Sequence, residues 1–256
     1  MLAVISDIHG NLEAFQAVLA HIGDADEIYC VGDLVGYGPN PNECCELVRK
    51  HGIKTVQGNH DFVCANLDRL DTADESFSSE DRALCKSIFE DKNTAAKAAS
   101  QWTNSVLTEE NKQFLREVPV EINAHGFTMV HGMPGPKAHM LNEYLFPGQA
   151  RKELLEAVEG HLLIVGHSHV PIRTQWVVNP GSVGQPRDRN WRACFATFQD
   201  AWFKFTYLRN GDMSFRLVSQ LVNIHRVPYD VGTTVKKIKE ESGIPDSLGD
   251  RLVVGL

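Results

Sequence analysis

The chain has 256 residues, of which 43% are hydrophobic, and a formal net charge of −8 at pH 7. This length is enough for one large α/β domain with a well-buried core, and no apolar run reaches the roughly 18 residues that would cross a bilayer. An acidic surface repels nucleic-acid backbones, and the densest basic cluster, Lys236-Lys237-Ile238-Lys239, is expected to be the solvated face of a late helix. The composition therefore argues against a membrane-spanning protein and against a nucleic-acid-binding protein.

The compartment is suggested by the start of the chain and by the cysteines. The first residues lead directly into an apolar strand. A signal peptide would show a basic segment followed by a long apolar segment, and this pattern is not seen. The six cysteines show no Cys-x-x-Cys spacing, so we expect free, buried thiols. Both features predict a cytoplasmic protein.

Strand and helix patterns alternate over the first sixty residues. The apolar runs are short, and the helical segments between them begin at capping residues and end at glycines. Strands are expected at Leu2–Ser6, Glu27–Val31 and Ile53–Gln57, with helices from Asn11 to Gly23 and from Asn40 to Gly52. This order predicts a parallel β-α-β-α-β half.

A helical insertion, residues of about 76–117, breaks this rhythm. Helix starts are expected near Ser78, Asn93 and Thr108. After the insertion we expect strands at Val118–Ile122, Phe127–Val130 and Leu162–Val165, and a helix at Gly148–Val158.

Strand patterns dominate after Pro171. Phe203, Phe205 and Tyr207 alternate with Lys204, Thr206 and Leu208, as expected for a strand, and Asn210-Gly211 is a strong hairpin turn signal. A helical tail, residues of about 220–256, contains an expected helix at Gly232–Glu241. Strands at both ends with helices outside predict an α/β fold, a four-layer α-β-β-α sandwich of two mixed sheets with flanking helices, formed as a single domain over residues 1–256.

Five short islands carry seven residues of the kinds that bind metals. Four of the islands follow directly after an apolar, strand-like run. Their mixture of carboxylates, imidazoles and one amide suits two divalent transition cations held close together. The seven residues are Asp7, His9, Asp33, Asn59, His131, His167 and His169.

The position of these islands after strands suggests that they meet in the fold. Ligands of open α/β sheets gather beyond the carboxyl ends of the strands, and the glycines at 32, 58, 132 and 166 allow sharp turns there. Each island alone has a structural explanation: Asp7 could cap a helix, Asn59 could sit in a turn, and His131 could be a core histidine. Five such islands in one chain favour a metal site.

In this order, Asp-x-His, Gly-Asp, Gly-Asn-His-Asp, His-Gly and Gly-His-x-His resemble the motifs of the calcineurin-like metallophosphoesterases. The match runs from Asp7 to His169 and continues less specifically through residues 179–188, and compact bacterial and archaeal members are similar in length. The resemblance implies that Asp7, His9 and His169 hold one metal. It assigns the other metal to Asn59, His131 and His167, with Asp33 bridging both.

The resemblance also implies roles around the metals. Two dications, two aspartates and a bridging hydroxide leave a net positive charge that attracts phosphate. His60 would protonate or stabilise the leaving oxygen, with Asp61 orienting it. Asn11 and Arg187 are candidates for phosphate contact, although Asn11 could instead cap a helix and Arg187 could pair with Asp188. Tyr37 either lines the pocket or packs at a turn.

The expected activity is two-metal-dependent hydrolysis of small phosphate esters, by in-line attack of a metal-bridging hydroxide, with a weak preference for phosphodiesters. Mn²⁺ is the first metal expected, with Fe, Zn, Ni or Co as alternatives. No membrane and no nucleic acid is expected as a partner. Two other functions remain open: a nuclease with the same metals, and a non-enzymatic interaction module of the same fold. The sequence leaves the substrate, the metal and the oligomeric state undetermined.

Overall fold

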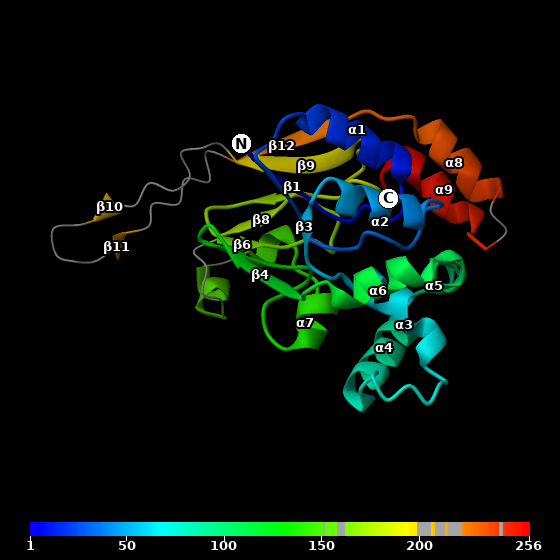
Figure 1. The fold of residues 1–256 in the computed structure, drawn as a ribbon. Helices are drawn as coiled ribbons and strands as arrows, with labels where there is room; N and C mark the ends of the chain where they lie inside the picture. The colour runs from blue at the N-terminus through cyan, green and yellow to red at the C-terminus, as the bar shows by residue number, and fades with distance from the viewer. Residues whose placement is uncertain (151, 158–161, 199–205, 208–212, 215–221, 241–242) are drawn as a thin grey trace.

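The computed structural model describes all residues except 151, 158–161, 199–205, 208–212, 215–221 and 241–242. Two five-stranded sheets lie against one another, with helices around them (Figure 1). The first sheet has the order β12-β9-β1-β2-β3 and the second has the order β4-β5-β6-β8-β7. The predicted pair of sheets is thus confirmed.

Both sheets are mixed. In the first, β1, β2 and β3 run parallel, whereas β9 and β12 add antiparallel neighbours on one side. In the second, β5, β6 and β8 are parallel, and β4 and β7 form antiparallel edges. The bounds are β1 (Leu2–Ile5), β2 (Glu27–Cys30), β3 (Lys54–Thr55), β4 (Glu121–Ala124), β5 (Phe127–Val130), β6 (Leu162–Ile164), β7 (Ile172–Arg173), β8 (Val177–Asn179), β9 (Ala193–Phe198) and β12 (Val222–Val227).

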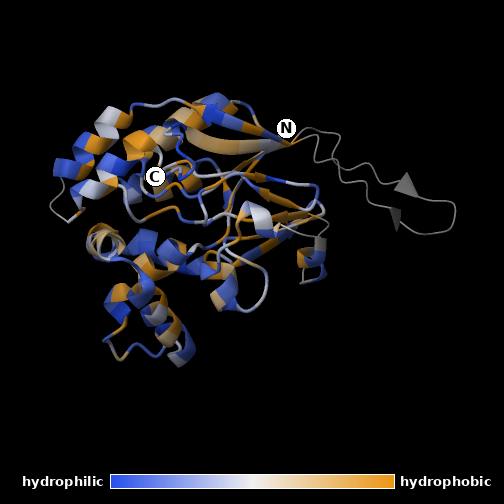
Figure 2. Ribbon diagram, turned by 180° about the vertical axis from the view of Figure 1, so that it is seen from behind, coloured by the Kyte–Doolittle hydropathy of each residue, from blue (hydrophilic) through white to orange (hydrophobic). Residues whose placement is uncertain are grey.

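The central strands are apolar on both faces because both faces are covered. Successive side chains of a strand point to opposite sides. Leu2 and Val4 of β1 therefore join the core between the two sheets, where they meet Phe127 of β5. Ala3 and Ile5 join a second core on the opposite face, against helices. The orange colour of the inner strands in Figure 2 follows from this two-sided burial.

Helices α1 (Leu12–Ile22), α2 (Pro41–Lys50), α8 (Val231–Glu240) and α9 (Asp246–Val254) lie on the side of the first sheet (Figure 1). The outer face of the second sheet is covered by α7 (Lys137–Asn142) and short 3-10 turns, through Leu145 and the partly buried Met140 and Leu154. The helix predicted at Gly148–Val158 takes the form of two 3-10 helices, Pro147–Gln149 and Lys152–Ala157, while residues 151 and 158 lie outside the described part of the chain. Pro147 and Gly148 offer no capping side chain, and the shorter 3-10 bonds satisfy the backbone instead.

The insertion forms the three expected helices, α4 (Ser79–Asp91), α5 (Thr94–Val106) and α6 (Glu109–Glu117). They cluster beside α3 (Asn59–Asn66) in Figure 1. The side chains of Ser78, Asn93 and Thr108 each accept a hydrogen bond from the backbone N–H three residues on, as N-caps do. Ala96 and Ala99 of α5 pack in one cluster with Ile238 of α8 and with Leu248 of α9. The insertion therefore touches the C-terminal helices.

Several remaining predictions are confirmed or corrected. The strand expected from Val118 begins only at Glu121, and helices α3 and α7 lie where no helix is predicted. The tail predicted to be helical from about residue 220 contains α8 and α9 but begins with strand β12, which pairs with β9. Strands β10 (Thr206–Tyr207) and β11 (Met213–Ser214) pair antiparallel, whereas Phe203, Phe205 and Asn210-Gly211 lie outside the described residues. All six cysteines are free and buried. No helix in the described part of the chain has the length and apolar character to cross a membrane.

Candidate dinuclear metal centre

The seven candidate ligands lie just beyond the carboxyl ends of five parallel strands, three from the first sheet and two from the second. Asp7 follows β1 and Asp33 follows β2, and the ladder between these strands continues into the loops: Asp7 N donates to Gly32 O at 3.0 Å and His9 N donates to Asp33 O at 2.9 Å. Asn59 is the first residue of α3, after β3. The histidines follow strands of the second sheet: His131 follows β5, and His167 and His169 follow β6.

The side chains form two buried groups. One consists of Asp7, His9 and His169, and the other of Asp33, His131 and His167. Within each group, one ligand atom per residue lies within 4.8 Å of the others. All six side chains are at most 3% exposed. The first group has the residues that the resemblance assigned to one metal, whereas the second group holds Asp33 together with two of the three residues assigned to the other metal.

Asp33 lies between the two groups. Its Oδ2 is 3.2 Å from His131 Nε2 in its own group and 3.6 Å from His9 Nε2 in the other. The other carboxylate oxygen, Oδ1, accepts a hydrogen bond from the backbone N–H of His60 at 2.8 Å, which fixes the plane of the carboxylate. One oxygen thus faces both groups, an arrangement that suits a shared ligand.

Asn59 completes the second group. The end of its amide lies 3.1 Å from Asp33 Oδ2, 3.2 Å from His167 Nδ1 and 3.3 Å from His131 Nε2. With the amide oxygen inward, Asn59, Asp33 Oδ2, His167 Nδ1 and His131 Nε2 present four acceptor atoms to one point, a set that suits a cation; with the amide nitrogen inward, Asn59 would instead donate to the other three atoms. The site therefore has the donor chemistry of a metal centre in both halves.

Backbone carbonyls orient the four histidines and fix which nitrogen is free. Nδ1 contacts Val35 O at 3.0 Å in His9, Val31 O at 2.6 Å in His131 and Gln185 O at 2.5 Å in His169. In His167 the contact is reversed, because Nε2 lies 3.2 Å from Asn142 O. Each ring donates its N–H to a carbonyl and presents its other nitrogen to the group. Metal-ligating histidines are usually oriented in this way.

The charges of the groups also suit cations. Both oxygens of the Asp7 carboxylate are buried without a hydrogen-bond partner, a costly arrangement unless a cation compensates it. Burial raises the pKa of Asp7 and lowers the pKa of His9 to about 3. Burial opposes protonation of His131 as well, but the charge of Asp33 raises the pKa of His131 to about 9. These shifts reflect buried charges that metal binding would neutralise.

The loops hold these side chains at the cost of backbone strain. Five of the seven ligand residues have positive φ, between 50° and 62°, in the region that glycine prefers: Asp7, His9, Asp33, His167 and His169. Strained residues of this kind persist where the surrounding structure fixes them, typically at functional sites. Gly58 is needed for a different reason, since a Cβ there would lie 2.1 Å from Asp33 Oδ1.

Residues 1–200 match the family model described as "Calcineurin-like phosphoesterase superfamily domain". The chain belongs to the calcineurin-like phosphoesterase superfamily. It is therefore a metal-dependent phosphoester hydrolase, and the alternative of a non-enzymatic module is not supported.

Relatives along the whole chain agree with this membership. The chain is 34% identical to an uncharacterized protein of Methanocaldococcus jannaschii, over 100% of this chain and 98% of that protein. It is similar to the crystal structure of a metallophosphoesterase from Sphaerobacter thermophilus, with 31% identity, a TM-score of 0.75, and coverage of 100% and 99% of the two chains. A shorter match, 35% identical over 92 residues, covers 31% of this chain and 34% of a symmetrical bis(5'-nucleosyl)-tetraphosphatase of Actinobacillus pleuropneumoniae.

His60 follows the ligand Asn59 in the phosphoesterase motif and lies beside the two groups. Its ring contacts those of His9 and Tyr37, with centroids 4.9 and 4.4 Å away. Its Nε2 lies 3.0 Å from Lys92 Nζ, while its Nδ1 is buried without a partner. Burial, and then the charge of Lys92, hold the pKa of His60 well below its usual value.

The role expected for Asp61 is wrong. Its Oδ1 accepts hydrogen bonds from the N–H groups of Leu34 at 2.8 Å and Val35 at 3.2 Å, and its Oδ2 accepts one from Gly58 N at 3.1 Å. The carboxylate thus holds the loop after Asp33 against the start of α3 and does not orient His60. Three backbone donors satisfy a buried carboxylate better than one imidazole could.

Asn11 is occupied by structural hydrogen bonds. Its Oδ1 accepts from Ala14 N and from the Thr234 hydroxyl, both at 3.1 Å. Its Nδ2 donates to Gly184 O at 2.9 Å and to the Tyr229 hydroxyl at 3.2 Å. The helix-cap alternative is correct, and the amide has no group left for a phosphate.

Replacing Asn11 with Ala is therefore expected to lower the stability of the protein and to leave its catalytic rate nearly unchanged. Loss of the cap and an unpaired Gly184 carbonyl should reduce the free energy of unfolding by about 1–3 kcal/mol. Urea denaturation would measure this loss, and phosphoesterase assays well below the unfolding midpoint should show kcat within about twofold of the original. A fall of kcat by about 10² or more in folded, metal-loaded protein would restore Asn11 to the substrate site.

Arg187 lies in a pocket beside the metal centre and does not pair with Asp188, which instead contacts Arg226. Its Nη2 donates to Gln185 Oε1 at 3.0 Å and reaches the Tyr37 hydroxyl at 3.4 Å. Tyr37 lines the same pocket.

Three further pocket residues were missed by the sequence reasoning: Lys92, Tyr144 and Arg251. Lys92 follows α4, Tyr144 follows α7 and Arg251 lies in α9. The Tyr144 ring stacks on His167 with centroids 3.9 Å apart. None of the three belongs to a motif, so only the fold reveals that they are near the site.

Proposed function

We propose that the chain hydrolyses small phosphate esters with two divalent cations, one held by Asp7, His9 and His169 and the other by Asn59, His131 and His167, with Asp33 shared. The position of Asp33 Oδ2 between the two groups carries this proposal. When bound, such cations lower the pKa of water and neutralise charge on a transferring phosphoryl group.

The residues around the centre support an in-line displacement at phosphorus. His60 and Lys92 meet at the wall of the pocket, 3.0 Å apart, where they would stabilise or protonate the leaving oxygen. The pKa of Lys92 is lowered to about 8, chiefly by burial, so its ammonium is still charged at neutral pH and readily gives up a proton.

The size of the pocket favours a small substrate. Its volume is about 350 Å³, at the lower end of the range for small-molecule sites. The net charge of −8 disfavours a nucleic-acid backbone, so we place the nuclease alternative second. The partial relationship to a bis(5'-nucleosyl)-tetraphosphatase also supports a small phosphate compound.

Removal of metal is expected to abolish activity. Protein treated with a chelator should not hydrolyse p-nitrophenyl phosphate or bis-p-nitrophenyl phosphate, and added Mn²⁺ should restore turnover, because the buried ligands alone provide no nucleophile. Mn²⁺ is the first ion to test, followed by Fe, Zn, Ni and Co. Turnover that survives chelation, with metal content below 0.1 ion per chain as a rough threshold, would defeat the proposal.

A further inference from the structure

The pocket beside the metal centre is lined by three cationic side chains from different parts of the chain. Lys92 comes from the end of α4, Arg187 from the segment before β9, and Arg251 from α9. The side chains of Tyr37 and Tyr144 line the same space. No ion pair joins any of the three cations to a carboxylate within the part of the chain that the structure describes. Asp91 also lines the pocket, and the charge of Asp33 acts on Lys92 more strongly than that of Asp91.

Arg251 is unusual because no carboxylate pairs with its guanidinium in the described part of the chain, where its polar partner is Tyr37. Its Nε and Nη2 are buried without a hydrogen-bond partner. The guanidinium is held by packing, with its Cζ 4.9 Å from the centre of the Tyr37 ring. An unpaired, largely buried cation costs free energy, so it is expected where an anionic ligand repays that cost.

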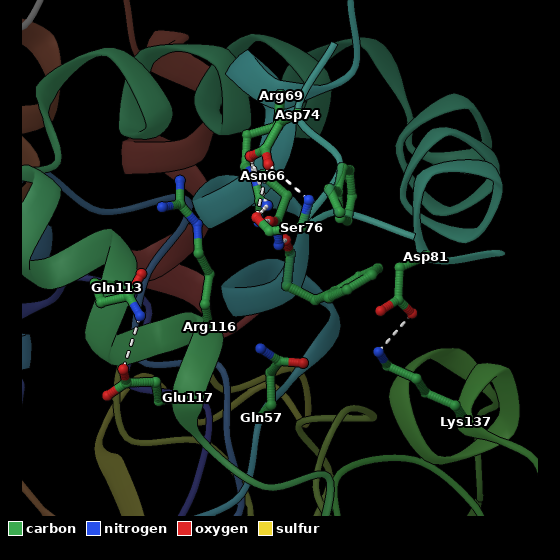
Figure 3. A pocket seen from close by; sticks show the side chains of 12 residues that line it. Gln57, Asn66, Arg69, Asp74, Ser76, Asp81, Gln113, Arg116, Glu117 and Lys137 are labelled. Atoms are coloured by element: carbon green, nitrogen blue, oxygen red, sulfur yellow. Dashed lines mark hydrogen bonds and ion pairs between the residues drawn. The ribbon is translucent and has the colours of Figure 1, made fainter. Parts of the chain in front are cut away.

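A second pocket shows the ordinary arrangement. It lies between α3, the insertion and α7, has a volume of about 390 Å³ and also contains three cations, Arg69, Arg116 and Lys137 (Figure 3). Here each cation has a carboxylate partner: Asp74 at 2.7 Å, Glu109 at 2.6 Å and Asp81 at 2.6 Å. The positive charge of this pocket is therefore cancelled within the protein, and it carries no inference about a ligand.

Tyr37 lies between the two arginines and the metal centre. Its ring lies against His9 and His60, with centroids 4.7 and 4.4 Å away. The guanidinium carbons of Arg187 and Arg251 lie 5.9 and 4.9 Å from the centre of the same ring. The two arginines are thus separated from the metal ligands by little more than one aromatic ring.

We infer that Arg187 and Arg251 form a second anion-binding subsite, and that the substrate carries a further phosphate group close to the one that is hydrolysed. This inference rests on the proposed function, because the scissile phosphate must occupy the metal centre. Arginine forks match phosphate oxygens, and Arg187 and Arg251 would hold the second phosphate while Lys92 remains with His60. The two arginines are positioning residues that select the substrate class, namely phosphate esters or anhydrides with adjacent phosphates.

Binding of two matched anions to the full-length, Mn²⁺-loaded protein tests the subsite. The probes are inorganic phosphate and methylenediphosphonate, which carries two phosphonate groups and cannot be hydrolysed, each titrated calorimetrically at the same free Mn²⁺. The measured quantity is the ratio of their dissociation constants. In the unaltered protein we expect methylenediphosphonate to bind at least about tenfold more tightly, and we expect Arg187→Gln and Arg251→Gln each to reduce that ratio at least about fivefold.

Control variants separate the subsite from other causes. Lys236→Gln removes an exposed positive charge of α8, one helix away from Arg251, and should leave the ratio unchanged. Arg251→Lys keeps a cation but loses the forked guanidinium, so its ratio of dissociation constants should fall between that of the unaltered protein and that of Arg251→Gln. If Arg251→Gln fails to fold or to hold Mn²⁺, Arg187→Gln and Arg251→Lys give the answer.

The outcomes also distinguish this inference from the proposed function. An unchanged ratio in the folded arginine variants would overturn the subsite, as would an equal weakening of both anions. Absence of turnover by the unaltered protein on any phosphate ester would instead defeat the proposed function, and the binding ratio would still be measured.

Discussion

Replacing Asp33 with Ala is expected to abolish binding of the metal pair and to remove nearly all turnover. Asp33 Oδ2 is the atom that faces both ligand groups, 3.2 Å from His131 and 3.6 Å from His9. Without this carboxylate the two groups retain one negative side chain between them, that of Asp7. Metal analysis of the purified variant should give well below two ions per chain, and hydrolysis of bis-p-nitrophenyl phosphate should fall by about 10³ or more.

The large loss of metal binding expected in Asp33→Ala follows from electrostatics. Two dications in a paired site stand about 3.5–4 Å apart and repel one another by about 18 kcal/mol at an effective dielectric constant of about 20. A carboxylate in contact with both attracts each by about 15 kcal/mol on the same scale, before hydration is counted. With the shared carboxylate, its attraction to the two cations exceeds the repulsion between them. Without it, the repulsion dominates.

Two controls exclude trivial explanations. Ala is disfavoured at the positive φ of 54° that Asp33 adopts, so Asp33→Asn, which tolerates this region, should fold normally and still lose metal. Asp24→Ala removes an exposed carboxylate and should keep both metals and full turnover. An Asp33→Ala protein that still holds two ions per chain would show that Asp33 does not bridge.

The candidate ligands could be predicted because their signal is local. Asp7, Asp33 and His131 each follow a short apolar strand, and the carboxyl ends of parallel strands meet at one edge. The same reasoning placed Gly58 beside the site, although its reason is the close approach of Asp33 rather than a positive φ. The two sheets could be predicted as well, since strands buried on both faces are recognisable as unbroken apolar runs.

The pocket could not be predicted because it depends on packing between distant segments. Lys92 reaches His60 only because the insertion folds over α3, and Arg251 reaches Tyr37 only because α9 packs against α5. Helix α9 itself buries just Leu248, Gly249 and Leu252, which is too short a stripe to give a clear helical period. For Asp61 the residue was correctly singled out, but its partners are backbone N–H groups, whose direction no sequence pattern reveals.

Replacing His60 with Ala should keep the metals and lower kcat by about two to four decades, the usual contribution of a general acid or an equivalent polar group. His60 belongs to neither ligand group, so metal analysis should still give two ions per chain. Its ring packs against Tyr37 and the ligand His9, and its Nε2 faces Lys92, which places it at the wall of the pocket beside the ligands.

The leaving group gives a sharper readout of this role. A residue that stabilises the leaving oxygen matters most when that oxygen is a poor leaving group, so the loss in His60→Ala should be greater for an alkyl ester than for a p-nitrophenyl ester. His51→Ala, at an exposed position after α2, is the matched control and should behave like the unaltered protein. Equal losses for both esters would assign His60 to substrate binding, and a loss below about tenfold for the alkyl ester would remove it from the chemistry.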